Sequence, residues 1–436
     1  MINKTLSNIF KGDKGIWMVF FFLCIVSIIE VYSASSMLTY KGSYIAPIMK
    51  HIGLLLVGVV FMVVTSNFNC GYFKFLTPFA LGFSLITLAL VLITGATTNG
   101  ASRWFDICGI QFQPSEVAKG SLVLATAQIL SALQTEDGAD KKAFKYILFI
   151  CMFIIPLIMV ENLSTAMLLC MVIVMMMFIG RVPIKQLSGL IASAIIALIV
   201  VVSLVMLLGK DPAEQQPESK VLTEQVEKQE PKSKGIFDRV FHRFDTWKGR
   251  IDKFINKEEI APDEVDLIDN SAQENYAKVA IATSNVVGKG PGSSEACDFL
   301  SQAFSDFIYA IIIEEMGIVG AFGVAMLYII LLFRTGRIAN RCENNFPAFL
   351  AMGLALLLVT QALFNMMVAV GLAPVTGQPL PLISKGGTSS IINCVYIGVI
   401  LSISRSAKRK QETIIEQTSA ETAETFATED LVADRS

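Results

Sequence analysis

Ten apolar segments of bilayer-crossing length recur along this 436-residue chain. A helix rises 1.5 Å per residue, so about 20 apolar residues cross a hydrocarbon core of roughly 30 Å. The segments lie near residues 15–35, 46–66, 75–95, 115–134, 144–160, 162–180, 186–209, 307–333, 346–370 and 388–404. Because lipid cannot hydrogen-bond to the backbone, such segments form helices. We therefore expect an all-α integral membrane protein of about ten transmembrane helices.

Composition supports this class and excludes others. Hydrophobic residues make up 53% of the chain and charged residues only 17%, whereas about a quarter of a soluble protein is charged. A net charge of -2 provides no basic field for nucleic acid. The sequence contains no nucleotide-binding glycine loop and no Cys-x-x-Cys pair, which argues against ATP coupling and against a cysteine metal site.

Two local features refine the order of the spans. The first apolar run is too long for a cleavable signal peptide and is better explained as the first span. The runs at 144–160 and 162–180 are separated only by Val160-Glu161-Asn162. This junction predicts a tight hairpin between antiparallel helices.

Basic residues in the short loops predict the orientation, because lysine and arginine favour cytoplasmic loops. With the N-terminus inside, sixteen basic residues lie near cytoplasmic ends: Lys4, Lys11, Lys14, Lys74, Lys141, Lys142, Lys145, Arg181, Lys185, Arg334, Arg337, Arg341, Arg405, Lys408, Arg409 and Lys410. The four in the opposite short loops are Lys41, Lys50, Arg103 and Lys385. Both termini are therefore expected in the cytoplasm.

These spans divide the chain into five regions: a cytoplasmic N-terminus (1–14), transmembrane helices 1–7 (15–209), a large extracytoplasmic loop (210–306), transmembrane helices 8–10 (307–404) and a cytoplasmic tail predicted to be disordered (405–436). The stretch 210–234 is too polar to fold alone. Between 236 and 255, apolar residues recur at helical spacing among basic residues that include Arg243, which predicts an interfacial amphipathic helix. It could rest on anionic headgroups or hold an anionic lipid substrate.

Ionisable side chains in apolar spans indicate function or tight internal pairing, because burying a charge in lipid is unfavourable. The candidates are Glu30, Glu116, Lys119, Glu161, Asp306, Glu314 and Glu315. Glu116 and Lys119 are three residues apart and can pair on one helix face. That pair is compatible with a structural or a functional role.

Three outer loops carry polar motifs. In the first, Arg103 and Trp104 could anchor the chain at headgroup depth, and Pro114 and Ser115 resemble a helix start. In the second, the polar loop Gly288–Ser294 precedes Ser305 and Asp306, which could simply cap the next helix.

The third outer loop, from Asn365 to Ser390, is rich in proline and glycine. Irregular backbone near membrane depth survives only inside protein or around a wet cavity. We therefore expect a re-entrant segment that lines a substrate cavity.

These blocks together resemble the SEDS (shape, elongation, division and sporulation) family of ten-helix membrane glycosyltransferases. The matching blocks are Gly-Ala-Ser-Arg-Trp, Gln-Pro-Ser-Glu-Val-Ala-Lys, Gly-Lys-Gly-Pro-Gly-Ser, Ser-Asp-Phe-Ile-Tyr-Ala with Glu-Glu-Met-Gly, and Pro-Val-Thr-Gly-Gln-Pro-Leu-Pro-Leu-Ile-Ser-Lys-Gly-Gly-Thr-Ser. The opening Gly-Asp-Lys-Gly-Ile-Trp and the closing Leu-Ser-Ile-Ser-Arg are most similar to the cell-division branch. The rod-elongation branch is the alternative.

The chain departs from the family pattern at three places. A block usually written Pro-Asp-x-Gly-Thr-Ala is Glu161-Asn-Leu-Ser-Thr-Ala166 here, so whether Glu161 replaces the usual aspartate stays open. Lys385 precedes the Gly-Gly pair, where an aromatic is common. The polar insertion at 210–234 is the third departure, and its role is open.

The resemblance implies one catalytic residue and a set of substrate contacts. It maps the essential acidic residue of the family onto Asp306. The candidate substrate-binding residues are Arg103, Trp104, Glu116, Lys119, Arg243, Lys289, Ser293, Lys385, Gly386, Gly387 and Ser389. Among the cations, Arg103 and Lys119 lie in matching motifs, and arginine is the better bidentate partner for pyrophosphate.

The implied reaction is the polymerisation of lipid II into β-1,4 glycan strands, with release of undecaprenyl pyrophosphate. The 4-hydroxyl of one sugar attacks the anomeric carbon of another with inversion, which requires a base and cations for the leaving pyrophosphate. Partial burial would raise the pKa of Asp306, whereas a helix N-terminus would lower it. Asp306 could therefore be the base, orient the acceptor or bind a divalent cation. No other cofactor is expected.

The resemblance also implies a class B penicillin-binding protein as partner, other division proteins, and a location in the bacterial cytoplasmic membrane at the division septum. A second class of function is a non-catalytic lipid II flippase or division scaffold. A transporter would carry its essential charges near the midplane. The predicted position of Arg103, Lys289 and Asp306 at the outer rim favours an enzyme.

Overall fold

The computed structural model describes residues 11–34, 45–94, 96–98, 101–107, 110–208, 248, 272–296 and 305–407. In these residues, an α-helix lies at each predicted span: α2 (Lys14–Ala34), α3 (Ile45–Asn67), α4 (Cys70–Thr94), α5 (Pro114–Ala132), α6 (Lys141–Glu161), α7 (Leu163–Ile179), α8 (Ile184–Leu208), α11 (Ile308–Ala339), α12 (Asn345–Ala369) and a last helix over Thr388–Ala407. Eight are long and apolar enough to cross a membrane; α7 is shorter, and α5 carries the buried Glu116 and Lys119. The protein is an all-α integral membrane protein, and ten spans remain a prediction.

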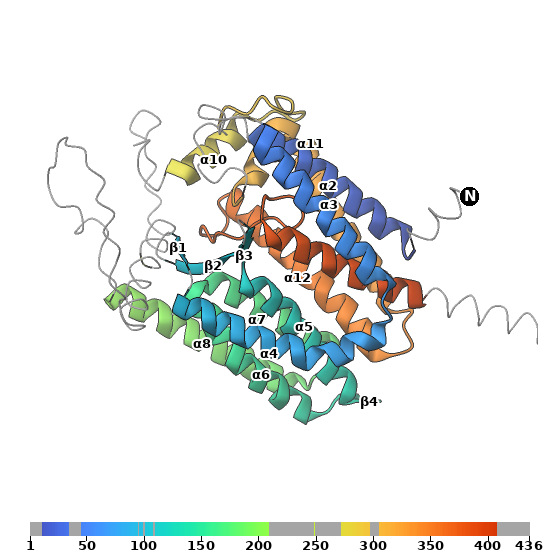
Figure 1. The fold of residues 1–436 in the computed structure, drawn as a ribbon. Coiled ribbons are helices and arrows are strands. Elements are labelled where there is room, and N and C mark those ends of the chain that lie inside the picture. Colours follow the sequence, from blue (N-terminus) through green and yellow to red (C-terminus); the bar gives the residue numbers. More distant parts are fainter. Residues whose placement is uncertain are drawn as a thin grey trace, which may run out of the picture.

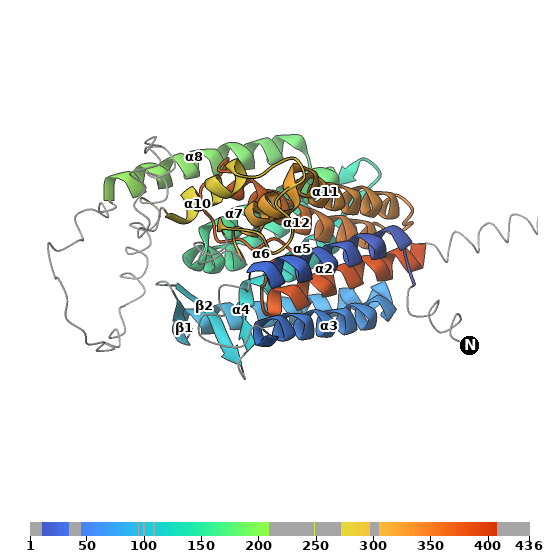
Figure 2. The same cartoon turned by 90° about the horizontal axis from the view of Figure 1, so that it is seen from above.

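The helices pack side by side in one elongated bundle (Figures 1 and 2). The last helix and α12 form its centre: 72% and 67% of their spans are buried inside the protein, against 6% for α8. Around them, α12 packs against α5, α7 and α11, and α4 packs against α5. Outer helices expose apolar side chains such as Phe75, Phe79, Ile86 and Ile93 on α4. Apolar faces of this extent require lipid or a partner protein as their surroundings.

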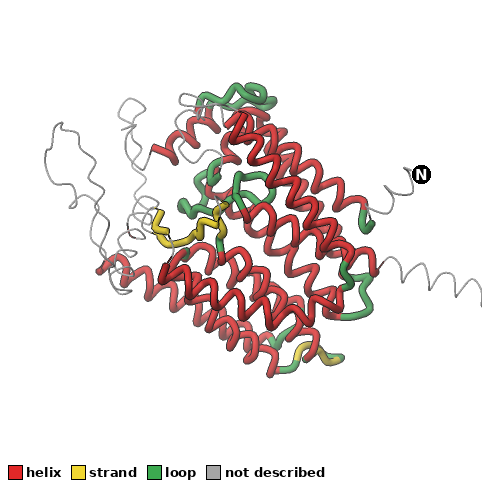
Figure 3. Tube along the Cα trace, in the orientation of Figure 1, coloured by secondary structure: helices red, strands yellow, loops and turns green. Residues whose placement is uncertain are grey.

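Strands and long loops gather at one end of the bundle, which we call the loop end (Figure 3). It carries the antiparallel sheet β1 (Ala96–Thr98), β2 (Ala101–Ile107) and β3 (Ile110–Phe112), and the helix α10 (Ala272–Ala282). The sequence predicted only a loop before α5 and did not predict α10. A small hairpin, β4 (Gln134–Thr135) and β5 (Gly138–Ala139), lies at the opposite end (Figure 1).

Polar contacts at the opposite end hold the first and last described helices to their neighbours. Arg334 on α11 bonds to Asp13 at 3.1 Å, just before α2. Arg405 on the last helix donates to Asn67 on α3 at 3.1 Å. The two ends of the described chain therefore lie at the same end of the bundle, away from the loop end (Figure 1).

Helix α11 is broken at Gly317, within a segment that the sequence predicted as one continuous span. Gly317 has φ 69° and ψ -174°, and a Cβ there would lie 2.4 Å from the Val286 carbonyl oxygen. The break frees two carbonyl groups, and a loop fills the gap: Lys289 N donates to Glu314 O at 3.0 Å and Gly290 N donates to Glu315 O at 2.9 Å. The buried backbone thus stays hydrogen-bonded, as a low-dielectric interior requires.

The predicted junction between the fifth and sixth spans is confirmed. Helix α6 ends at Glu161 and α7 begins at Leu163, with only Asn162 between them. The Asn162 side chain accepts a hydrogen bond from Thr165 N and caps α7. The insertion 210–234, most of the interfacial helix 236–255 and the tail after 407 lie outside the described residues.

Candidate active site at the loop end

Asp306 lies two residues before the start of α11 at Ile308 and is partly buried. Its carboxylate accepts a hydrogen bond from Ser305 Oγ at 3.0 Å. Two other elements hold its backbone: Asn365 Nδ2 on α12 donates to the Asp306 carbonyl at 2.9 Å, and Ser384 Oγ donates to the Ser305 carbonyl at 2.7 Å. The alternative that Ser305 or Asp306 caps the helix is wrong, because the cap residue is Phe307 and no side chain caps it. The Asp306 main chain is thus fixed by tertiary contacts rather than by helix capping.

Residues 371–387, which we call the proline-glycine loop, are non-helical as predicted. Asn365 itself belongs to α12 rather than to this loop. Its amide also donates to the Gln378 carbonyl at 2.7 Å, and Gln378 Nε2 donates to Thr165 Oγ1 on α7 at 2.5 Å. Tyr328 OH on α11 donates to the Pro381 carbonyl at 2.5 Å. Irregular backbone is tolerated in a membrane protein where neighbouring elements form hydrogen bonds with its polar groups. Helices α7, α11 and α12 provide such bonds to the proline-glycine loop.

Glu116 and Lys119 form the predicted pair on α5. Lys119 Nζ lies 2.9 Å from Glu116 Oε1, and the side chains are 0% and 2% exposed. Lys119 also donates to Gln361 Oε1 at 2.7 Å, and Gln361 Nε2 donates to the Pro379 carbonyl at 3.0 Å. This buried pair is therefore joined to the proline-glycine loop through α12.

A continuous polar path results, which we call the polar ladder: Lys119, Gln361, Asn365 and Asp306, with the loop carbonyls between them. Gln361 and Asn365 are four residues apart and lie on one face of α12. Neither was predicted as a site residue. Two polar side chains at helical spacing in an apolar span were the signal that could have identified them.

The structure also brings the first and third outer loops together. Thr388 Oγ1 donates to the Gln111 carbonyl at 2.9 Å, and a Cβ at Gly387 would lie 3.4 Å from the same oxygen. Ser389 Oγ donates to the Gly386 carbonyl at 2.7 Å, where the last helix begins. The Gly386-Gly387 motif therefore lies next to β3, the strand that precedes α5.

Four further predicted substrate contacts are Lys385, Trp104, Arg103 and Arg243. The structure describes the side chains of the first two only. Lys385 is partly buried, and burial followed by the charge of Lys50 lowers its pKa. Trp104 lies in β2, partly buried, with Ala96 as its β1 partner. Arg103 lies in β2, but its side chain is outside the described set, as is all of Arg243.

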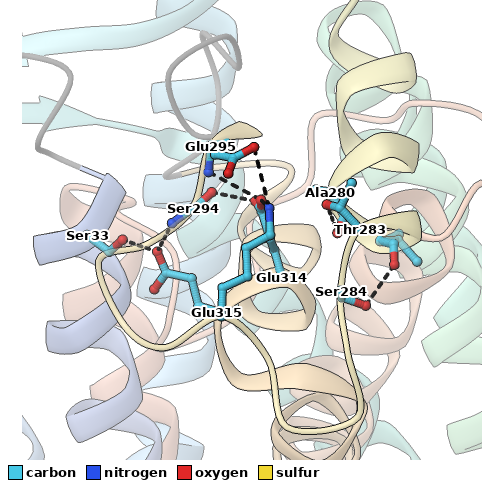
Figure 4. A network of polar contacts seen from close by, with 10 residues as sticks. Ser33, Ala280, Thr283, Ser284, Ser294, Glu295, Glu314 and Glu315 are labelled. Carbon is cyan, nitrogen blue, oxygen red and sulfur yellow. Dashed lines mark hydrogen bonds and ion pairs between the residues drawn. The ribbon is translucent and has the colours of Figure 1, made fainter. Parts of the chain in front are cut away.

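Lys289 belongs to a separate cluster at the α11 break, in which Figure 4 shows Ser294, Glu295, Glu314 and Glu315. Lys289 Nζ lies 2.8 Å from Glu314 Oε1 and 3.7 Å from Glu295 Oε2. The hydrogen bond to Glu314 is the main cause that raises the Lys289 pKa. Ser293 is exposed. Within the described part of the chain, no group of three or more His, Cys, Asp or Glu side chains could hold a metal ion.

The helical bundle with a buried polar ladder at one end defines a polytopic membrane protein with a candidate site at the loop end. Residues 13–409 match the family of cell cycle proteins that comprises FtsW, RodA and SpoVE. The chain belongs to this family, as the sequence motifs predicted.

Curated relatives and solved structures agree with this assignment. The chain is 29% identical to the probable peptidoglycan glycosyltransferase FtsW of Geobacter sp. (strain M18), over 90% of this chain and 96% of that protein. It is 26% identical to the peptidoglycan glycosyltransferase MrdB of Escherichia coli (strain K12), over 90% and 95%. A chain of a peptidoglycan synthase complex that coordinates polymerization and crosslinking superposes with a TM-score of 0.65 at 23% identity, over 91% and 98%. For the rod shape determining protein RodA of Thermus thermophilus the TM-score is 0.59 at 22% identity, over 92% and 99%.

Proposed function

We propose that this chain is an inverting peptidoglycan glycosyltransferase that polymerises lipid II and releases undecaprenyl pyrophosphate. The names of the curated FtsW and MrdB relatives support the reaction class. The observation that carries the proposal is the anchoring of Asp306 from two sides, by Asn365 on α12 and by Ser384 through Ser305. A carboxylate that acts on a bound sugar needs a main chain that does not move.

The chemistry assigns distinct roles to the residues. The acceptor 4-hydroxyl forms the new glycosidic bond as the bond from the anomeric carbon to pyrophosphate breaks, and the hydroxyl proton passes to the Asp306 carboxylate. Arg103 and Lys385 are the cations proposed for the leaving pyrophosphate. Lys119 is fully buried against Glu116 and Gln361, which supports a positioning role through the polar ladder. In this assignment it holds the proline-glycine loop against α12.

The proposed setting is the bacterial cytoplasmic membrane, with the loop end extracytoplasmic and both termini cytoplasmic. The excess of lysine and arginine in loops at the opposite end supports this orientation. FtsW proteins among the relatives favour a role at the division septum. A RodA-type role in elongation is the alternative, and localisation of a tagged copy in growing cells separates midcell from sidewall.

The proposed partner is a class B penicillin-binding protein, together with other division proteins. A related chain is part of a synthase complex that couples polymerization to crosslinking, which supports a crosslinking partner. The partner would bind the outer, lipid-facing part of the bundle or the loop end, where apolar side chains are exposed.

The test is lipid II polymerisation by the purified chain with its cognate partner. We expect glycan from wild type and from the exposed control Asp137→Ala, in the β4–β5 hairpin at the opposite end. Asp306→Ala and Asp306→Asn should make at least about a hundredfold less, the range set by loss of an acid-base group. Glycan formation at the wild-type rate by a folded Asp306→Ala would refute the catalytic role. Transport of lipid II across vesicles without polymerisation would favour the flippase.

A further inference from the structure

The side chain of Ser27 on α2 makes its hydrogen bonds to two other elements. Its hydroxyl donates to the Ile383 carbonyl in the proline-glycine loop at 2.7 Å and lies 2.9 Å from His51 Nε2 on α3. Serines in helices commonly donate to the carbonyl four residues earlier, as Ser84 does to Ala80. Ser27 and His51 are buried, so water does not hold the hydroxyl in its outward orientation. A protein group must do so.

The direction of these two bonds follows from the number of available protons. A carbonyl oxygen only accepts, so the single hydroxyl proton of Ser27 is used at Ile383. The Ser27 oxygen then accepts from His51, and His51 Nε2 carries a proton. Both the neutral Nε2–H tautomer and the imidazolium meet this condition, so the arrangement does not depend on the charge of His51. His51 thus holds the Ser27 hydroxyl toward the loop.

The peptide group between Ile383 and Ser384 is held at both ends. Ser27 bonds to its carbonyl, and its N–H donates to the Leu380 carbonyl at 2.9 Å. Because a peptide group is planar, these two bonds together fix its orientation. The position of the Ser384 side chain follows from it.

The turn before this peptide group is strained. Leu382 is buried and has φ 68°, a backbone conformation that residues with a side chain rarely adopt. Such a conformation persists only where surrounding contacts enforce it. The bond from Ser27 to the next residue, Ile383, is one of these contacts. Its loss would allow the turn to relax and Ser384 to move with it.

Ser384 connects this turn to the candidate catalytic residue. Its hydroxyl donates at 2.7 Å to the Ser305 carbonyl, which belongs to the peptide group before Asp306. The amide of Asn365 holds the peptide group after Asp306, at 2.9 Å. Two separate routes therefore fix the two peptide groups that flank Asp306, and the first of them begins at His51.

We propose that His51 and Ser27 are positioning residues for Asp306. His51 orients the Ser27 hydroxyl, and Ser27 holds the loop peptide from which Ser384 bonds to the residue before Asp306. The inference rests on the proposed function, because it gives both residues a role in the reaction of Asp306. Neither side chain contacts a reacting group, so their loss should displace Asp306 and lower kcat rather than raise KM.

The first test examines the hydrogen bonds in the wild-type chain. The sequence contains two histidines, His51 and His242. Nuclear magnetic resonance of the full chain in nanodiscs, with nitrogen-15 in the histidine rings, therefore gives two sets of ring signals, and His51→Gln identifies those of His51. We expect a protonated Nε2 at neutral pH. An unprotonated Nε2 would overturn the inference, because Ser27 would then donate to His51 instead of Ile383.

The second test measures lipid II polymerisation with the cognate partner. His51→Leu and Ser27→Ala should lower kcat by about tenfold or more, with KM within about twofold of wild type. His51→Gln should keep kcat within about threefold, because its side-chain amide supplies a donor in place of Nε2–H. Ser27→Ala is the smaller change and carries the test if His51→Leu does not fold.

Ser402→Ala is the matched control for Ser27→Ala. Ser402 is a buried serine on the last helix, and it donates to the Phe68 carbonyl at 2.5 Å, at the opposite end of the bundle. Its loss removes the same kind of bond far from Asp306. We expect both variants to lower the unfolding temperature and only Ser27→Ala to lower kcat.

The outcomes separate this inference from the proposed function. Wild-type kcat in folded Ser27→Ala, with Asp306→Ala inactive, would overturn the inference and leave the proposed function standing. Equal losses of kcat in Ser402→Ala and Ser27→Ala, or in His51→Gln and His51→Leu, would also overturn it. An inactive wild type, or Asp306→Ala at the wild-type rate, would remove the proposed function and the inference with it.

Discussion

The side-chain amide of Asn365 bridges two backbone carbonyls, donating to Asp306 at 2.9 Å and to Gln378 at 2.7 Å. One side chain on α12 thereby sets the position of the α11 start relative to the proline-glycine loop. Because both acceptors are backbone atoms, the arrangement depends on Asn365 and not on the side chains of its partners. The candidate site is consequently built from three elements around one amide.

Asn365→Ala should lower kcat for glycan formation by about tenfold or more while KM changes little. The substitution frees the Asp306 backbone, and a small displacement of a catalytic group has large effects on rate. The lost hydrogen bonds should also reduce stability by about 1–3 kcal/mol. Asn340→Ala, at the exposed C-terminus of α11, is the control with unchanged kinetics. Wild-type kcat in a folded Asn365→Ala would contradict the positioning role.

Lys119→Met should destabilise the protein by about 3–5 kcal/mol, because it leaves the Glu116 carboxylate buried and unpaired. The double variant Lys119→Met with Glu116→Gln removes both charges and should recover much of that loss. Thermal unfolding in detergent measures both effects. Polymerisation should stay low in the double variant, since Gln361 loses its donor. Equal stability of the single and double variants would show that the pair carries no such coupling.

Gly317→Ala should destabilise the fold by about 2 kcal/mol or more. The residue has φ 69°, and the added Cβ would meet the Val286 carbonyl oxygen at 2.4 Å; side chains in that backbone region are strained. Gly323→Ala, six residues later in α11, has nothing within 4 Å of its Cβ and should be neutral or slightly stabilising. The two unfolding temperatures form a matched comparison, and similar values would refute the strain at the break.

The Lys289–Glu314 pair should give an alkaline stability limit. Its hydrogen bond to Glu314 raises the Lys289 pKa above the ordinary 10.5. The native state then holds this proton more tightly than the unfolded state, so the contribution is fully present below about pH 10 and is lost as pH rises further. Lys289→Gln should flatten the pH dependence above about pH 10. An unchanged alkaline profile in that variant would show that the pair does not contribute.

Much of the fold was predictable because it depends on local patterns. Apolar runs placed the helices, Pro114 marked the start of α5, and the single residue Asn162 between two runs predicted the tight hairpin. The break in α11 was missed, because Gly317 lies in an apolar run and its conformation depends on a distant loop. The short strands before α5 were missed for a different reason: β1 and β3 have only three residues each, too few for a recognisable alternating pattern.

The candidate site was only partly predictable. The motifs identified Asp306 and the Glu116–Lys119 pair, which lie three residues apart in one helix. Gln361 and Asn365 carried no motif, and their partners lie in other elements: Lys119 on α5, 242 residues away, Asp306 before α11, and the proline-glycine loop.

The amino-acid sequence by itself determined that the chain is a helical membrane protein with a polar site at one end, because spans follow from the length and apolarity of local segments. Tertiary structure alone decided which polar groups meet: the amide that holds Asp306 and the loop that fills the α11 break. Lipid imposes burial on each helix separately, whereas hydrogen bonds between helices depend on how all of them pack together.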